Sequence, residues 1–332
     1  MKGNRRKFLV IGLGTGAAAA ALGARRWLGG SDCHKRTGFA LGAPITMTVV
    51  HPGGDEAERA LDEAFAELNL VDRLMSLYDP TSQLSELNKY GCLDRPHPHI
   101  VSVLRASREL SQRTDGAFDI TVQPLWSLYA DARQRGRTPN DAELQRELPR
   151  IDWRRVDVNE DRVKIPDGTQ ITLNGIAQGF AADRVLDALR RRGVTHALVD
   201  AGEIGSLGAS ATGLPWKVGI RHPRHAGEFL SAARLDGRCM ATSGDYATSF
   251  SSDFQSHHIF DPHTGRSPAQ CSSVSIVAPT ATEADGLSTA VFVLGLERGM
   301  QLVRATPRTD ALVVLKDGTT MATEHFPSET PG

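Results

Sequence analysis

Apolar residues recur at helical spacing in several stretches of the chain. Between residues 55 and 78 they form one continuous stripe, and charged residues occupy the opposite face, as in an amphipathic helix. The stripe consists of Ala57, Leu61, Ala64, Phe65, Leu68, Val71 and Met75. Similar spacing, with helix-ending signals such as Gly193 after one segment, predicts further helices over 99–113, 141–148, 175–192, 281–294 and 297–305.

Short apolar and β-branched runs predict strands. The runs 156–158 and 163–165 flank Asn159-Glu160-Asp161, which indicates a hairpin. Residues 133–140 read as a polar loop. Other strands are predicted over 40–50, 118–122, 171–173, 197–200, 216–220, 273–278, 311–315 and 320–323. Because helices and strands do not alternate strictly, the pattern indicates an α+β fold with mixed or antiparallel sheets and packed helices.

Composition limits the function. The 332 residues are 40% hydrophobic and 23% charged, which excludes a disordered chain, a collagen-like repeat and a polytopic membrane protein. The net charge is -1, but residues 1–26 hold six Lys or Arg and no acid. The remainder has 32 basic and 39 acidic residues, a net charge of -7. Since nucleic-acid binding needs clustered basic residues, we expect no nucleic-acid partner.

The first 26 residues resemble an export signal. Arg5-Arg6-Lys7-Phe8-Leu9 precedes an apolar run, rich in Gly and Ala, that is short for a membrane span. Paired arginines before Phe-Leu resemble a twin-arginine signal, although Asn4 stands where Ser or Thr is usual. An uncleaved N-terminal anchor is the alternative. We expect residues 27–332 to form a single domain, of one or two lobes, in the periplasm.

Four cysteines remain in that part of the chain. They allow three pairings, among which the sequence does not choose, and inert buried thiols are an equal alternative. The absence of Cys-x-x-Cys from the sequence disfavours a zinc ribbon or a thioredoxin-type motif. The four are Cys33, Cys92, Cys239 and Cys271.

Residues 171–179 read as a strand, a glycine-bearing turn and a helix start. Such a start points free N–H groups and a partial positive charge outward, which suits a phosphate. Gly175 and Gly179 permit close approach of the backbone. The segment lacks the lysine of a P-loop and the third glycine of a dinucleotide fingerprint, so an ordinary helix start is the alternative.

A polar stripe interrupts the apolar helix predicted after Thr280. Thr280 and Glu283 fit a capping box, which gives Glu283 a structural role. Asp285, Ser288 and Thr289 follow at i, i+3 and i+4 and therefore share one face. A buried stripe of this kind needs partners, and a hard cation such as Mg²⁺ would be one. A solvated stripe or a local side-chain network is the alternative.

Histidines and acids gather in the segments 242–246 and 256–265. His258 and Asp261 could form a base and its orienter, although Asp261 also begins a good turn sequence. The adjacent histidines could equally be a surface metal-binding pair. A serine hydrolase built on Ser243 is disfavoured because no Gly-x-Ser-x-Gly elbow is present.

A single acid, Asp119, stands in the apolar, β-like run over 118–122. A carboxylate is costly to bury without a partner. We therefore expect Asp119 to bind something.

Together these segments resemble the FAD:protein FMN transferases, the ApbE family. The resemblance runs from about residue 41 to 326 and rests on six motifs in order: Ser76–Tyr78, Thr114–Pro124, Leu173–Asp183, Thr242–Tyr246, His258–Gly265 and Val277–Thr289. It implies a T-fold-like architecture within the α+β class. It also implies an enzyme that transfers FMN from FAD to a threonine or serine hydroxyl of a partner protein. A phosphoester forms, AMP is released and Mg²⁺ is required.

The resemblance further implies site residues. His258, oriented by Asp261, is the expected base near the reacting phosphate, and Asp245 is the reserve. The expected metal ligands are the Gly175 carbonyl and the side chains of Asp285 and Thr289. The expected FAD contacts are Tyr78, Ala117, Phe118, Asp119, Thr172, Gln178 and Ile259.

Two positions depart from the family pattern. Thr172 stands where many members have Asp, and Ser288 where some have a second acid. These departures leave open an exported FAD or FMN carrier without transfer activity; a Mg²⁺-dependent FAD pyrophosphatase is a third hypothesis. Residues 172–179 and the export signal most resemble the NosX branch, which implies a NosR-like membrane acceptor and a role in maturation for nitrous oxide respiration.

Overall fold

The computed structural model describes residues 32–329, and its centre is an eight-stranded sheet. All neighbouring strands in this sheet are antiparallel. The strands run in the order β1 (Asp32–Ala40), β2 (Ala43–His51), β6 (Ala197–Asp200), β7 (Ile204–Leu207), β10 (Cys239–Gly244), β11 (Cys271–Ala278), β12 (Asp310–Leu315) and β13 (Thr320–Ala322).

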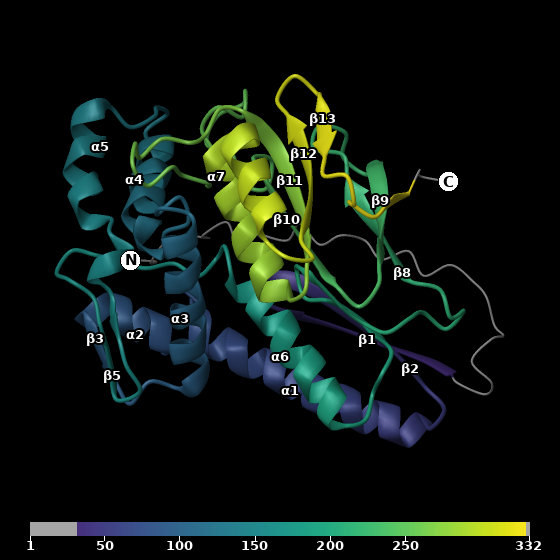
Figure 1. Cartoon of the computed structure of the whole chain (residues 1–332). Helices are drawn as coiled ribbons and strands as arrows, with labels where there is room; N and C mark the ends of the chain where they lie inside the picture. The colour runs from purple at the N-terminus through teal and green to yellow at the C-terminus, as the bar shows by residue number, and fades with distance from the viewer. Residues whose placement is uncertain (1–31, 330–332) are drawn as a thin grey trace, which may run out of the picture.

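Three long helices cover one face of this sheet (Figure 1). They are α1 (Gly54–Met75), α6 (Ala177–Arg191) and α7 (Ala281–Ala305). The apolar stripe of α1 faces inward as predicted, and Leu61, Leu68 and Val71 are fully buried. Full burial of one such side chain stabilises the fold by about 1.5–3 kcal/mol. This layer therefore fixes the ends of the helices relative to the strands.

A small sheet packs on the opposite face. It consists of β8 (Trp216–Arg221), β9 (Phe229–Leu235) and β14 (Ser328–Glu329), with β9 in the middle. Its inward residues, such as Val218 and Leu235, join outward residues of the large sheet, such as Met240 and Val277, in a second apolar cluster. The central strands β6, β7 and β11 are thereby buried on both faces.

A group of shorter elements lies beside the start of α7 (Figure 1). It comprises the helices α2 (Gln83–Tyr90), α3 (Pro98–Arg113), α4 (Gln123–Gln134) and α5 (Asp141–Glu147) and the three-stranded sheet β3 (Cys92–Asp94), β5 (Arg162–Lys164) and β4 (Asp157–Val158). Single 3₁₀ turns are η1 (Ile120–Val122), η2 (Leu148–Arg150) and η3 (Trp153–Arg155). The predicted hairpin at 156–165 is confirmed as β4 and β5.

The α+β class with antiparallel sheets is confirmed. The two helices predicted over 281–294 and 297–305 are one interrupted helix, α7, with a break at Gly295 (φ 75°). The Gln270 side chain caps the break, because its Oε1 accepts from Leu296 N at 2.8 Å. A β-carbon at Gly295 would overlap that same oxygen, so the break needs glycine.

Two strand predictions are wrong, and a third is confirmed in part as β2. Residues 118–122 and 171–173 are not strands; one backbone bond, from Thr172 N to Ile120 O at 2.8 Å, joins them. The strand predicted over 40–50 begins after a turn at Leu41 and Gly42, both with positive φ, which reverses the chain between β1 and β2. Apolar composition alone did not reveal these turns.

The structure tests the prediction on the cysteines but not the one on the N-terminal segment. All four cysteines are free thiols, and Cys239 and Cys271 are buried. The export signal predicted over 1–26 lies outside the described residues. Within residues 32–329, no helix combines the length and the apolar character needed to cross a membrane.

Candidate active site

A cavity opens where the short helices meet the large sheet and α7. Eight chain segments line it: the β1–β2 turn, the end of α1, the stretch 117–126, the stretch 172–178, the β6–β7 turn, β10, the loop 247–260 and the first turns of α7. Four aromatic rings are in its wall, those of Tyr78, Phe118, Trp126 and Phe260. Tyr78 is 75% exposed, so its ring is available for stacking against a flat molecule.

The charged residues in the cavity wall all have one sign. Four acids line it, Asp72, Asp119, Glu203 and Asp285, and the lining contains no lysine or arginine. Buried carboxylates are costly unless they are paired or bind a cation. The cavity is therefore electrostatically unsuited to an anion on its own.

Asp285 lies at the centre of this site because α6 and α7 approach closely. A β-carbon at Gly179 would overlap the Ala281 carbonyl, so glycine permits the contact. Gly179 N then donates to Asp285 Oδ2 at 2.9 Å. Burial raises the pKa of Asp285 to about 7. The Asp183 carboxylate on α6 fixes the start of α7, accepting from Ala281 N at 2.9 Å.

Three hydroxyls lie beside Asp285. Ser243 Oγ is 2.8 Å from Ser288 Oγ and 3.1 Å from Thr289 Oγ1. Ser288 Oγ also donates to the Asp285 carbonyl at 2.8 Å and does not line the cavity. Of the predicted stripe, Asp285 and Thr289 thus face the cavity, and Ser288 belongs to a local network. The Ser243 hydroxyl contacts hydroxyls on α7, an arrangement that contradicts a serine hydrolase triad.

The oxygen atoms of Asp285, Thr289 and Gly175 suit a hard cation. A β-carbon at Gly175 would lie 3.0 Å from Thr289 Oγ1, so the Gly175 backbone is next to Thr289. A carboxylate, a hydroxyl and a backbone carbonyl are the kinds of donor that Mg²⁺ and Ca²⁺ accept. No cluster of three or more His, Cys, Asp or Glu suited to a metal occurs within 32–329, so this mixed oxygen set is the candidate donor set in the cavity.

The predicted helix cap is confirmed in part. Thr280 Oγ1 accepts from Glu283 N at 3.1 Å and begins α7. The Glu283 side chain pairs with Arg113 at 3.0 Å, so it ties α7 to α3. Glu283 has the structural role that the sequence indicated.

His258 lines the cavity, but not with the predicted partner. The Thr248 carbonyl lies 3.2 Å from His258 Nδ1. Because a carbonyl can only accept, Nδ1 carries the proton and Nε2 is left as an acceptor. Burial lowers the pKa of His258 to about 4, so the ring is neutral at neutral pH.

Asp261 does not orient His258, and that prediction is wrong. Asp261 Oδ1 accepts from His263 N at 2.9 Å and Oδ2 from Thr264 Oγ1 at 3.0 Å. Gly265 N closes the turn by donating to the Asp261 carbonyl at 2.8 Å. The alternative interpretation of this sequence as a turn is the correct one.

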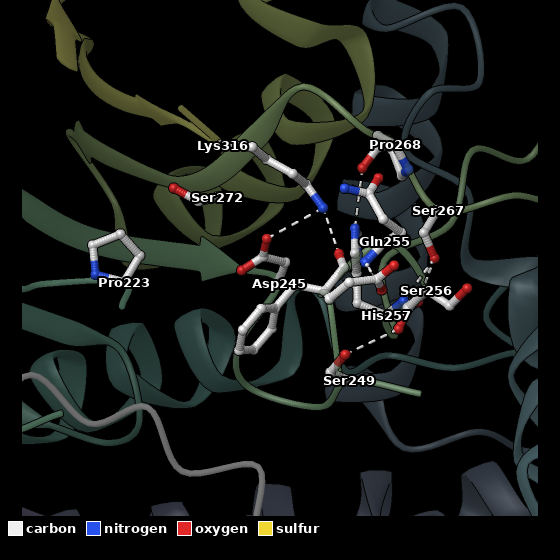
Figure 2. Close-up of polar contacts among 12 residues, drawn as sticks. Pro223, Asp245, Ser249, Gln255, Ser256, His257, Ser267, Pro268, Ser272 and Lys316 are labelled. Atoms are coloured by element: carbon white, nitrogen blue, oxygen red, sulfur yellow. Dashed lines mark hydrogen bonds and ion pairs between the residues drawn. The ribbon is translucent and has the colours of Figure 1, made fainter. Parts of the chain in front are cut away.

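Asp245, the reserve base, is also excluded by its position. It is fully buried outside the cavity lining, and Arg224 holds both of its carboxylate oxygens at 2.7 and 2.8 Å. Lys316 Nζ also lies 3.4 Å from Asp245 Oδ2 (Figure 2). Arg224 and Lys316 thus occupy this carboxylate, so it is not available to a substrate.

His257 is likewise an interior residue. It is fully buried, and its Nε2 lies 3.1 Å from the Pro268 carbonyl (Figure 2). Burial lowers the pKa of His257 to about 3. The two adjacent histidines are therefore not a surface metal-binding pair.

Asp119 binds its own chain. Its Oδ1 accepts from Thr121 N at 2.7 Å and Thr121 Oγ1 at 2.6 Å, and its Oδ2 accepts from Trp153 N at 3.1 Å. The carboxylate therefore caps η1 and joins it to η3, while the residue still lines the cavity. The expectation that Asp119 needs a partner is confirmed, and the partners are backbone and hydroxyl groups.

The remaining predicted contacts meet in one place. The cavity lining includes Tyr78, Ala117, Phe118, Thr172, Gln178 and Ile259, together with Gly175, Asp285 and Thr289. Among the lining residues that sequence reasoning missed are Asp72, Trp126 and Glu203. The available signal for Glu203 was an acid inside the apolar stretch 197–207, where a strand pair is buried.

Comparison with known proteins agrees with this geometry. A model of the ApbE family matches residues 41–313. A Treponema pallidum protein named FAD:protein FMN transferase is 33% identical over 287 residues, covering 79% of this chain and 78% of its own length. A Haemophilus influenzae protein of the same name is 29% identical over 309 residues, covering 86% and 89%.

Solved structures of ApbE proteins also resemble this chain. The ApbE protein of Thermotoga maritima superposes with a TM-score of 0.80 at 28% identity, covering 90% of this chain and 100% of its own. The flavinyl transferase ApbE of Pseudomonas stutzeri, in its apo form, superposes with a TM-score of 0.78 at 30% identity, covering 90% and 97%.

Proposed function

The chain belongs to the ApbE family, and from that premise we propose that it transfers FMN from FAD to a hydroxyl group of an acceptor protein. It is a flavin transferase of the kind that its relatives' names describe. The cavity provides aromatic rings for the flavin and adenine, and Asp285, Thr289 and Gly175 lie in its wall.

One observation carries the chemistry: the cavity has four acids and no lysine or arginine in its lining. The pyrophosphate of FAD is anionic, so the bare cavity would repel it. A divalent cation on Asp285, Thr289 and the Gly175 carbonyl would turn the repulsion of the pyrophosphate into attraction. The resemblance to the family implies that this cation is Mg²⁺. When bound, it would supply charge neutralisation at the phosphoryl oxygens.

The reaction balances with groups of this chain. The acceptor hydroxyl oxygen attacks the FMN-side phosphorus, the bond from that phosphorus to the bridging oxygen breaks, and AMP leaves with that oxygen. The hydroxyl proton needs an acceptor. His258 lines the cavity with Nε2 unprotonated, because the Thr248 carbonyl holds the proton on Nδ1.

The acceptor and the compartment are part of the proposal. Residues 172–179 and the paired arginines Arg5 and Arg6 support a member of the NosX branch. On this view the protein is exported by the twin-arginine route to the periplasm. There it would flavinylate a NosR-like membrane protein that serves nitrous oxide respiration.

The test uses residues 27–332, FAD, Mg²⁺ and a candidate acceptor domain. Flavin transfer predicts AMP release together with an acceptor mass increase equal to FMN. A Mg²⁺-dependent FAD pyrophosphatase would release AMP and free FMN without modifying the acceptor. A flavin carrier would give neither product, and either of these last two results would contradict the proposal.

A further inference from the structure

Glu203 is a buried acid in the cavity wall to which the proposed reaction assigns no role. It lies in the tight turn between β6 and β7, where Ala201 N donates to the Glu203 carbonyl at 3.0 Å. Gly202 in that turn has φ 93°, and a β-carbon there would overlap the Gln178 side chain. The turn is thus pressed against the start of α6, and Glu203 is only 7% exposed.

The Glu203 carboxylate is fixed by a hydrogen bond from the backbone of β10. Its Oε2 accepts from Thr242 N on β10 at 3.1 Å. The next residue on β10, Ser243, is the one whose hydroxyl lies 3.1 Å from Thr289 Oγ1. Both Glu203 and Thr289 line the cavity. Strand β10 therefore contacts both the Glu203 carboxylate and the α7 hydroxyls at two consecutive residues, and both sets of groups face one cavity.

The two buried acids Glu203 and Asp285 have no cationic partner. Among the ion pairs between residues 32 and 329, none includes either of them. Burial and the neighbouring Asp285 raise the pKa of Glu203 well above its ordinary value. Ser288, the neighbouring polar side chain of α7, is turned toward Ser243 and the Asp285 carbonyl. Helix α7 thus contributes a single carboxylate to the cavity.

We propose that Glu203 is the second acidic residue of the cation site. The cation would then face two carboxylates, that of Glu203 from the β6–β7 turn and that of Asp285 from α7. The inference rests on the cation of the proposed function and extends it to a residue that no sequence motif indicated. Glu203 acts here by holding the cation in place and not by touching the transferred group.

The test measures cation binding without FAD or acceptor. Glu203→Gln keeps the shape and an oxygen that accepts from Thr242 N, and it removes the charge. Titration calorimetry with Mg²⁺ and Mn²⁺ should show affinity weakened by at least about tenfold, as expected for loss of a unit charge near a divalent ion. The metal-free variant should melt at a higher temperature than metal-free wild type, because the amide avoids the cost of burying a second carboxylate near Asp285.

Two further variants make the result decisive. Asp200→Asn neutralises a buried acid at the same turn that does not line the cavity, so cation affinity should stay near that of wild type. Glu203→Asp keeps the charge and should bind the cation better than Glu203→Gln. It also supplies the comparison with wild type if the Gln variant does not fold.

Unchanged cation affinity and melting temperature in Glu203→Gln would overturn the inference. Equal weakening by Asp200→Asn would also overturn it, since the effect would then come from net charge alone. Failure of the proposed function would appear differently, as wild-type protein that binds the cation normally but transfers no FMN.

Discussion

At the scale of single residues, the proposed base is oriented by backbone and not by an acid. The sequence offered Asp261 as the partner of His258, because the two lie three residues apart. In the folded chain Asp261 closes its own turn, and the Thr248 carbonyl sets the proton of His258. A backbone carbonyl carries no signature in the residue types, so sequence reasoning found the histidine and missed its orienter.

His258→Gln tests the base directly. We expect FMN transfer to fall by roughly 10²–10⁴-fold, the usual contribution of a positioned general base. FAD binding, followed by flavin fluorescence, should persist because the aromatic wall is unchanged. A variant that binds FAD and transfers FMN at the wild-type rate would show instead that the loose transition state needs no base.

The lowered pKa of His258 predicts a pH-dependent stability. The pKa of the ring is about 4 in the folded protein and 6.5 for an unperturbed histidine, so the unfolded chain binds more protons between those values. Wild type should lose up to about 1.4 kcal/mol per pH unit relative to His258→Gln as pH falls from about 6.5 to about 4. Urea unfolding of both proteins across this window measures the difference. A constant difference would contradict the buried, neutral ring.

Asp285 should be indispensable for cation-dependent transfer. Asp285→Asn keeps an oxygen for Gly179 N and removes the charge, so the fold should persist while Mg²⁺-dependent AMP release is abolished. Thr289→Val removes one neutral donor and should weaken cation affinity less. A Mg²⁺ titration of AMP release by each variant measures both effects. Near-normal turnover in Asp285→Asn would remove Asp285 from the cation site.

At the scale of elements, a buried charge cluster holds the loop that carries His258. Asp245 at the end of β10 binds Arg224 from the β8–β9 connection and Lys316 from the end of β12. Lys316 also donates to the Phe254 carbonyl, and the Arg224 guanidinium lies 4.5 Å from the Phe254 ring centre. Figure 2 shows Lys316 between Asp245 and that loop. Two strands thereby fix the loop 247–260.

Asp245→Asn should loosen this cluster. Breaking a buried pair leaves its partner charges uncompensated, so we expect a loss of about 3 kcal/mol in unfolding free energy. Asp94→Asn, which breaks an exposed pair with Arg162, should cost under about 1 kcal/mol. Denaturant unfolding compares the two variants. Equal losses would mean that the Asp245 cluster is no more than a surface ion pair.

The long helices could be predicted from the sequence, and several short elements could not. The stripe of α1 and the break of α7 near Gly295 are local patterns. In contrast, β10 becomes a strand through pairing with β11, which lies beyond a long connection, and the segment 118–122 loses its strand character because Asp119 caps η1. Elements that depend on tertiary partners carry little local signal.

At the scale of the whole molecule, the export signal remains a prediction that concerns the precursor. Replacing Arg5 and Arg6 with Lys should retain the precursor in the cytoplasm, because the twin-arginine route distinguishes guanidinium from ammonium groups. Cell fractionation with immunoblotting measures the distribution. Normal periplasmic levels of the double variant would indicate the general secretory route.

The cavity draws on segments from Leu41 to Thr289, so no short contiguous piece of the chain contains it. Such long-range contacts form late in folding, because the entropy cost of closing large loops arises before the contacts stabilise the chain. The order of events in refolding follows from this. Helical circular dichroism should recover first, and quenching of added flavin should appear only with the final kinetic phase. Flavin binding would thus report when the native topology is complete.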